Sequence, residues 1–303
     1  MRIKRWQVVL LVVVAVLLLA KRALLDTVAE PSRDYLIDVA ALHQAAVGGG
    51  GELPATIEVE KVGEFAFPRT LVVAGDGFRM HPMVLLSHRV VWPGGRSVII
   101  DTAMSPEEGA KMPGSKPFPD AYQRMQTAML GADAILFTHE HEDHVGGVAK
   151  APNFDAIAGK VQMTREQWNG PKLAREAFPP GALEKLKQLD YTGLHTVAPG
   201  VVLQKAPGHT PGTQLVYVEL ATGTRYLFVG DIAWTEDNIR LQRGRPGIAT
   251  LLMKEDRGAV AAEVRALAGL PGDVHVVVAH DPVALKRDVA AGLFRLGFST
   301  STP

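Results

Sequence analysis

The sequence gathers its densest set of possible metal ligands in one short segment, Thr138–Gly147, which reads THEHEDHVGG. Four of its side chains are potential ligands: His139, His141, Asp143 and His144. In an extended chain, side chains two residues apart point the same way, so His139, His141 and Asp143 can converge on one point. Imidazole and carboxylate groups are the ligands that a borderline divalent ion prefers. The segment therefore predicts a metal site.

Three later positions could complete such a site. His209 lies in APGHTPG, Asp231 follows Val-Gly, and His280 lies in VAHD. His139, Asp231 and His280 each follow directly after an apolar run that is typical of a strand, and His209 follows one across a short turn. If these strands end at one edge of a sheet, their ligands meet there. We interpret the remaining histidines as surface or core residues: His43, His81, His88, His195 and His275.

The elements that must position these residues alternate between two patterns. Runs typical of strands cover 56–62, 71–74, 84–86, 90–92, 97–100, 134–137, 201–205, 215–220, 226–229 and 274–279. Helical patterns cover 31–47, 119–130, 162–168, 181–189 and 254–267. Strands grouped early and again late, with helices between them, favour two helix-covered sheets over a single parallel sheet.

Composition excludes several classes of protein. Lys and Arg together number 32, equal to Asp and Glu together, and no long basic run exists outside the N-terminus, so nothing indicates a nucleic-acid partner. The absence of cysteine excludes disulfides, thiol nucleophiles and any metal site that needs a thiolate. An apolar fraction of 47% in 303 residues is enough for a packed core.

The N-terminus carries an apolar run, Val8–Ala20, with basic residues on both sides of it: Arg2, Lys4, Arg5, Lys21 and Arg22. The run spans roughly 20 Å as a helix, less than the ~30 Å hydrocarbon core of a bilayer. Two interpretations stay open, a cleaved signal peptide and an uncleaved signal anchor. Basic residues stand where a small-residue cleavage site would be expected, which favours the anchor. We expect a membrane-anchored or secreted protein with its catalytic domain outside the cytoplasm, in the periplasm if the source is bacterial.

Three regions follow from these patterns. Residues 1–22 form the signal anchor or signal peptide. Residues 23–52 form a juxtamembrane helix and a glycine-rich linker, because four consecutive glycines at 48–51 do not hold a helix cheaply. Residues 53–303 form the metallo-hydrolase domain.

Taken in this order, the motifs resemble those of the metallo-β-lactamase superfamily over about residues 95–285. The resemblance implies a four-layer αββα sandwich, an α/β fold in which helices flank two mixed β-sheets. It also implies that Asp101, in SVIIDT, has a structural role. In such a site one metal takes His139, His141 and His209, the other takes Asp143, His144 and His280, and Asp231 bridges the two.

The resemblance further implies a binuclear hydrolase in which a hydroxide between two divalent ions attacks a carbonyl, phosphorus or sulfur centre. Zinc is the expected metal, and manganese or iron suits the same ligands. We assign Asp143 and Asp231 to catalysis. The expected partner is a small-molecule substrate, with the membrane contacted through the N-terminal segment.

Within the superfamily, the absence of cysteine and the presence of Asp231 argue against the β-lactamases. The segment 230–238 is similar to that of N-acyl homoserine lactone lactonases, which favours a lactonase or related esterase. Those lactonases have a tyrosine where this sequence has Trp234, and an indole N–H cannot shuttle a proton at ordinary pH. We expect Trp234 to contact substrate by lining an apolar pocket that suits an acyl chain. Arg243 and Arg245 are expected in a solvated loop.

Three alternatives remain open. A glyoxalase-II-like thioesterase shares the His209 and Asp231 motifs. The same ligands could hold a single iron in a persulfide dioxygenase. A membrane-tethered protein could bind metal without catalysis.

Overall fold

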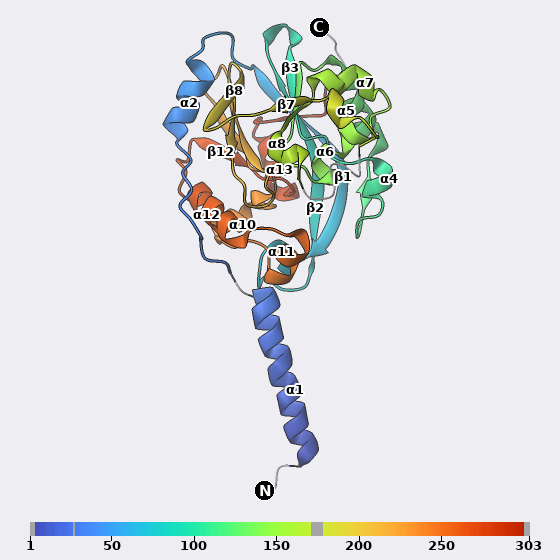
Figure 1. The fold of residues 1–303 in the computed structure, drawn as a ribbon, viewed down its shortest axis with the longest axis vertical. Helices are drawn as coiled ribbons and strands as arrows, with labels where there is room; N and C mark the ends of the chain where they lie inside the picture. The colour runs from blue at the N-terminus through green and yellow to red at the C-terminus, as the bar shows by residue number, and fades with distance from the viewer. Residues whose placement is uncertain (1–3, 27, 171–177, 300–303) are drawn as a thin grey trace.

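The computed structural model describes residues 4–26, 28–170 and 178–299. Figure 1 shows a rounded body from which one long helix, α1, projects. The body contains two large β-sheets, each built from strands in both parallel and antiparallel pairing. This arrangement confirms the predicted α/β fold with two mixed sheets flanked by helices.

The first sheet has the strand order β13-β1-β2-β3-β5, and the short β4 pairs with β1. Its strands are β1 (Thr56–Pro68), β2 (Met80–Val91), β3 (Ser97–Ile100), β4 (Lys116–Pro117), β5 (Ala134–Leu136) and β13 (Arg295–Leu296). The pairs β1–β13 and β3–β5 are parallel, and the others are antiparallel.

The second sheet has the order β12-β11-β10-β9-β8, and only β11 and β12 pair in parallel within it. Its strands are β8 (Leu194–Ala198), β9 (Val201–Lys205), β10 (Gln214–Glu219), β11 (Arg225–Phe228) and β12 (Val274–Val277). A small parallel pair, β6 (Gln162–Thr164) and β7 (Lys187–Leu189), lies next to β5 of the first sheet, which it meets through an isolated bridge between Ile135 and Val161.

Apolar side chains form three buried layers. One lies between the sheets and takes Ile57 and Val59 from β1 and Val218 and Phe228 from the second sheet. The outer face of the first sheet packs against α5 (Pro119–Gly131), α6 (Glu142–Ala149) and α7 (Phe154–Ile157). The outer face of the second sheet packs against α2 (Val39–Val47) and α12 (Arg257–Ala268). Burial of both faces of each sheet explains why so many strands are nearly all apolar.

The remaining helices are short connections: α3 (Arg69–Val72), α4 (Pro106–Gly109), α8 (Arg165–Trp168), α10 (Glu236–Arg240), α11 (Gly247–Met253) and α13 (Pro282–Ala290). Asp256 begins α12 by accepting a hydrogen bond from Ala259 N at 3.0 Å. The predicted inner face of this helix is buried, with Val260, Val264 and Leu267 in the outer core of the second sheet.

Four element predictions were wrong in part. The run 71–74, predicted as a strand, overlaps the helical turn α3. The predicted helix 162–168 begins as strand β6, and most of the predicted helix 181–189 is a 3-10 turn followed by β7. The pattern at 31–47 forms a helix only from Val39. The segments 71–74, 162–168 and 181–189 are short, and over so few residues periodicity does not separate strand from helix.

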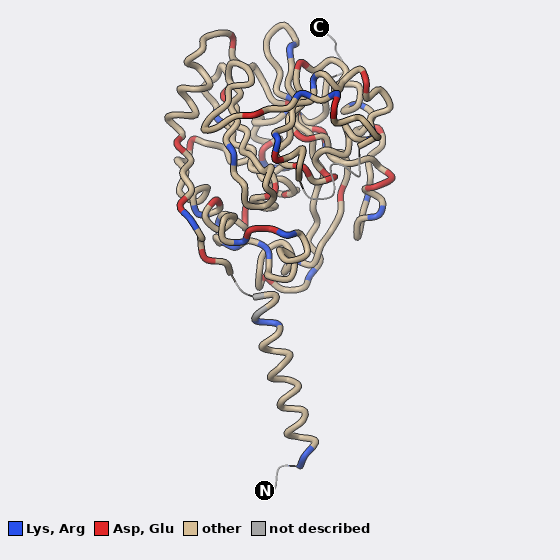
Figure 2. Tube along the Cα trace, viewed as in Figure 1, with Lys and Arg blue, Asp and Glu red and all other residues tan. Residues whose placement is uncertain are grey.

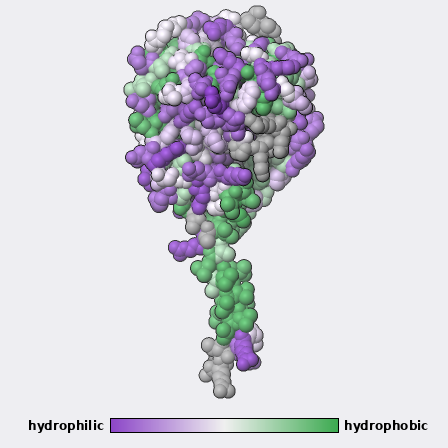
Figure 3. All heavy atoms as spheres, viewed as in Figure 1, coloured by the Kyte–Doolittle hydropathy of each residue, from purple (hydrophilic) through white to green (hydrophobic). Residues whose placement is uncertain are grey.

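The N-terminal helix α1 (Arg5–Lys21) continues into a π-helical turn, η1 (Arg22–Asp26), and none of the α1 residues is buried. Its apolar side chains form the green shaft of Figure 3, and the basic residues lie near its ends in Figure 2. None of the helices in the described ranges combines the length and apolar character needed to span a membrane. After this helix the chain runs along the body, where α2 buries Leu42 and Ala46 against the second sheet.

Candidate metal centre

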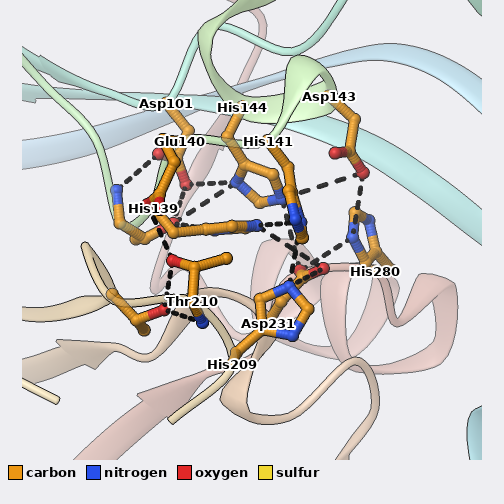
Figure 4. A network of polar contacts seen from close by, with 12 residues as sticks. Asp101, His139, Glu140, His141, Asp143, His144, His209, Thr210, Asp231 and His280 are labelled. Atoms are coloured by element: carbon orange, nitrogen blue, oxygen red, sulfur yellow. Dashed lines mark hydrogen bonds and ion pairs between the residues drawn. The ribbon is translucent and has the colours of Figure 1, made fainter. Parts of the chain in front are cut away.

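The seven residues predicted as metal ligands converge at one end of the two sheets, although they come from four separate segments (Figure 4). The first segment follows β5 and leads into α6. His209 follows β9 across a turn, Asp231 lies in the 3-10 turn η5 (Gly230–Ile232) after β11, and His280 follows β12. The ends of these strands therefore bring the candidate ligands together, as predicted.

One group consists of His139, His141, His209 and Asp231. His141 Nδ1 lies 3.1 Å from His139 Nε2 and 3.0 Å from His209 Nε2. Asp231 Oδ2 lies 3.7 Å from His139 Nε2 and 3.4 Å from His209 Nε2. Three ring nitrogens and one carboxylate oxygen thus face a common point.

A second group consists of Asp143, His144, Asp231 and His280. Here the other oxygen of Asp231, Oδ1, lies 3.1 Å from His280 Nε2 and 3.2 Å from His144 Nε2. Asp143 Oδ2 lies 3.6 Å from His280 Nε2 and 3.8 Å from His144 Nε2. The two oxygens of Asp231 therefore face different groups.

The donor atoms fit divalent cations. Ligands about 2.0–2.1 Å from a zinc ion in a tetrahedron lie about 3.4 Å from one another. The donor atoms described above lie between 3.0 and 3.8 Å apart. In the first group, His141 Nδ1 lies close to two other ring nitrogens, those of His139 and His209. Hydrogen bonds among these three imidazole nitrogens alone cannot give each of them a partner. In the second, His144 Nε2 is buried and forms no hydrogen bond of acceptable geometry, although it lies near Asp231. A buried polar atom of this kind indicates a missing partner.

The electrostatic environment shifts the pKa values of the histidines in opposite directions. Burial, together with neighbouring histidines, lowers the pKa of His139 well below its ordinary value and that of His141 to about 4. Burial alone would also lower the pKa of His144, but the carboxylates of Asp101, Asp143 and Asp231 outweigh it and raise that pKa. For Asp231 the effect of burial is outweighed by His280, His139 and His144, which lower its pKa. Asp231 is therefore ionised.

Asp101 holds the first ligand segment in place, as expected of a structural residue. Its carboxylate accepts hydrogen bonds from Thr138 N at 2.7 Å and Thr138 Oγ1 at 2.8 Å, and contacts His144 Nδ1 at 2.9 Å. Because a carboxylate only accepts, His144 Nδ1 donates and its Nε2 is left free to face the site. His280 is oriented in the same way, since its Nδ1 donates to Val84 O at 2.8 Å.

His209 is held by two residues that sequence reasoning missed. Its Nδ1 lies 2.8 Å from Glu255 Oε2, and Arg245 pairs with the same carboxylate. The prediction that Arg245 lies in a solvated loop was wrong, because its side chain is fully buried, whereas Arg243 is exposed. No motif marks Glu255, which stands in the charged run Lys254–Asp256.

Glu140, which stands between two candidate ligands, lies among buried polar groups. Its Oε2 accepts from Thr210 Oγ1 at 2.7 Å, while Oε1 is buried without a partner. Burial raises the pKa of Glu140 to about 7. Glu140 therefore joins the first ligand segment to the loop that carries His209.

Trp234 lies at the edge of the site, where its ring stacks on Phe67 with centroids 6.0 Å apart and meets the ring of His280 at 5.9 Å. The Arg245 guanidinium lies 4.9 Å from the centroid of its ring. The side chain is largely buried in the apolar core, next to the second group. The five histidines interpreted as surface or core residues lie outside both groups.

Comparison with known proteins agrees with this geometry. Residues 90–280 match the family model of the metallo-beta-lactamase superfamily. A hydroxyacylglutathione hydrolase from Aeromonas hydrophila is 31% identical over 159 residues, which cover 52% of this chain and 52% of that protein. An N-acyl homoserine lactonase from a Bacillus species is 31% identical over 104 residues, 34% of this chain and 40% of the relative. The chain thus spans about half the length, or less, of these curated relatives.

Among solved structures, an N-acyl homoserine lactone hydrolase with the product N-hexanoyl-L-homoserine at its catalytic metal center has a similar fold. The TM-score is 0.62 at 16% identity, and the alignment covers 78% of this chain and 96% of the other. The matched family model extends over most of the body and includes all seven candidate ligands. The chain therefore belongs to the metallo-β-lactamase superfamily.

Proposed function

We propose that this protein is a binuclear metal-dependent hydrolase that acts on a lactone or another carboxylic ester. The observation that carries the proposal is the position of Asp231, whose two oxygens each face a separate set of histidines. A carboxylate placed in this way can bridge two cations. Two divalent ions bound there, with zinc as the expected metal and manganese or iron as the alternatives, would supply an activated hydroxide and polarise the substrate carbonyl.

The residues of the chain have distinct roles in this proposal. Asp231 is buried and ionised, and fixes the spacing of the two groups. Asp143 is the more accessible of the two carboxylates, with 18% of its side chain exposed against 3% for Asp231. Its position favours it as the group that takes a proton from the attacking water and returns it to the leaving alkoxide. The indole of Trp234 cannot do so.

The apolar surroundings of Trp234 support a substrate with an acyl chain. Trp234 stacks on Phe67, and the partly buried side chains of Leu241 and Met253 belong to the same apolar cluster. An acyl chain that packed against these side chains would be stabilised by about 0.8 kcal/mol for each methylene group that it buries. The similarity to an N-acyl homoserine lactonase supports the same class of substrate.

The second candidate is a thioesterase of the glyoxalase-II type. The observation that favours it is the longer match, 159 residues, to a hydroxyacylglutathione hydrolase. A thioester presents the same carbonyl carbon to the same nucleophile, and the leaving thiolate needs no proton. The absence of a tyrosine at position 234 is therefore expected to slow thioester hydrolysis less than lactone hydrolysis.

Metal analysis and a substrate panel test the proposal together. Two zinc, manganese or iron ions per chain, with turnover of acylated lactones above that of thioesters, phosphodiesters and β-lactams, is the expected result. One iron per chain with oxygen consumption on a persulfide would favour the dioxygenase instead. Full metal occupancy without turnover of any of these compounds would favour a protein that binds metal without catalysis.

We also propose that residues 1–22 act as a signal anchor or signal peptide, with the body outside the cytoplasm. The support is the exposure of an apolar helix bracketed by basic residues. Fractionation of expressing cells, with protease added to intact and to permeabilised spheroplasts, tests this. Protection of the body in intact spheroplasts would contradict it.

A further inference from the structure

The ring of His209 has one nitrogen toward the candidate metal site and the other against a buried carboxylate. Nε2 faces His141 and Asp231, while Nδ1 lies 2.8 Å from Glu255 Oε2. The side chains of His209 and Glu255 are 0% and 1% exposed. Because an ionised carboxylate can only accept, the proton lies on Nδ1, and the lone pair of Nε2 points to the site.

Glu255 reaches this position through the local backbone. Lys254 ends α11 in the left-handed conformation, with φ 62°, which turns the chain toward the core. Glu255 N then donates to Thr250 O at 2.9 Å, and Asp256 N donates to Gly208 O at 3.0 Å. The second bond ties this turn to the residue that precedes His209. The carboxylate and the histidine are therefore fixed to one another by main chain as well as by side chains.

The positive charge of Arg245 stabilises the buried carboxylate of Glu255. Its Nε lies 2.8 Å from Glu255 Oε2, and its Nη2 pairs with the same oxygen. Nη2 also lies 3.1 Å from His209 Nδ1, but that nitrogen already carries a proton, so this is a close approach and not a second hydrogen bond. The guanidinium carbon of Arg245 lies over the ring of Trp234, 4.9 Å from its centroid.

We propose that Arg245 and Glu255 are a pair of positioning residues that hold His209 in the Nδ1-protonated tautomer, with Trp234 as the platform for Arg245. The inference rests on the proposed function, because it takes His209 as a metal ligand. Partners of this kind fix the ring orientation of a ligand and raise its basicity, and their loss commonly lowers metal affinity about 10–100-fold. Trp234 then has a structural role, the support of Arg245, in addition to its position at the edge of the site.

The test measures metal binding by the full chain. Metal-free protein is titrated with Co²⁺, followed by calorimetry and visible absorption. Glu255→Ala is expected to weaken one of the two binding events about 10–100-fold and to change its absorption spectrum. Glu255→Gln is expected to retain most of the affinity, because its amide oxygen still accepts from Nδ1. Arg245→Lys keeps the charge but loses the planar fork, and is expected to fall between them.

A matched control exists elsewhere in the chain. Glu219, at the end of β10, contacts His43 Nδ1 at 2.8 Å, the same geometry outside both ligand groups. Glu219→Gln is expected to leave Co²⁺ affinity unchanged. Nitrogen-15 spectra of the histidine rings provide a readout without metal, since His209 is expected as the Nδ1–H tautomer in the wild type and in Glu255→Gln, and as a mixture in Glu255→Ala.

The outcomes separate the two proposals. Wild-type protein that binds two ions, together with Glu255→Ala binding both with unchanged affinity, would overturn the positioning role alone. Wild-type protein that binds no cation would overturn the proposed function and the inference with it. If Glu255→Ala does not fold, Arg245→Lys decides, because wild-type affinity and an unchanged spectrum in this variant would contradict the role of the ion pair.

Discussion

The carbonyl oxygen of Thr102 lies 2.1 Å from the place where a β-carbon on Gly147 would stand. Gly147 belongs to α6, the helix that begins within the first ligand segment, and Thr102 belongs to the loop after β3. The same loop is bonded to α6 at a second point, since Thr102 N donates to His144 O at 2.7 Å. A glycine at 147 thus lets the helix approach this loop, and the approach sets the depth at which Asp143 and His144 enter the site.

Gly147→Ala is expected to destabilise the protein by about 1–3 kcal/mol, because either the helix or the loop must move. Displacement of α6 is also expected to weaken metal binding. Urea unfolding and metal titration measure the two effects. Gly131→Ala is the control, since nothing lies within 4 Å of its added β-carbon. An unchanged unfolding midpoint for Gly147→Ala would contradict the close approach.

Asp143→Ala is expected to abolish turnover and to lower metal content, because it removes a ligand of the second group and the proposed proton carrier. Metal analysis after gel filtration and a lactone assay measure both. Asp143→Asn separates the two roles, since an amide oxygen can still bind a cation but cannot take a proton at neutral pH. Full metal occupancy with retained activity in Asp143→Ala would refute the assignment.

His88 predicts a pH dependence of stability. It is buried between the sheets against Phe228, and burial lowers its pKa to about 4, against the attraction of Asp101. In the unfolded chain its pKa is about 6.5, so between these two pH values the unfolded state binds more protons than the folded state. The free energy of unfolding therefore decreases as the pH falls. The loss reaches about 3 kcal/mol when the pH falls from about 6.5 to 4.

His88→Leu is expected to remove that part of the pH dependence. Unfolding free energies of the two proteins are compared at several values between pH 8 and pH 5, where the difference at pH 8 gives the packing cost alone. The stability of the wild type relative to His88→Leu should fall as the pH falls. Curves that stay parallel would show that His88 is not the titrating group.

Trp234→Ala is expected to raise KM for acylated lactones by an amount that grows with the length of the acyl chain. The reason is that a longer chain buries more apolar surface against this ring. A series of substrates from short to long acyl chains measures the trend, and Trp234→Phe, which keeps an apolar ring, should weaken it less. An equal loss for all chain lengths would mean that Trp234 does not line the acyl pocket.

Local sequence was sufficient to predict the candidate ligands because each stands beside a strong signal. His139, Asp231 and His280 follow apolar strands, and side-chain alternation places His139 and His141 on one side. The two-sheet architecture could also be predicted, since long apolar strands with helices between them need both sheet faces covered. The type of short elements such as 71–74 and 181–189 could not be predicted, because tertiary contacts decide between strand and helix in such segments.

Sequence by itself determined which side chains could bind a cation and in what order they come. Tertiary structure alone decided what supports them: that Arg245 is buried on Trp234, that Glu255 faces His209, and that Gly147 lies against Thr102. These contacts join residues on different elements, so no pattern along the chain encodes them. Their strength depends on burial, because a charge that would be weakly paired in water interacts strongly once the fold removes water from it.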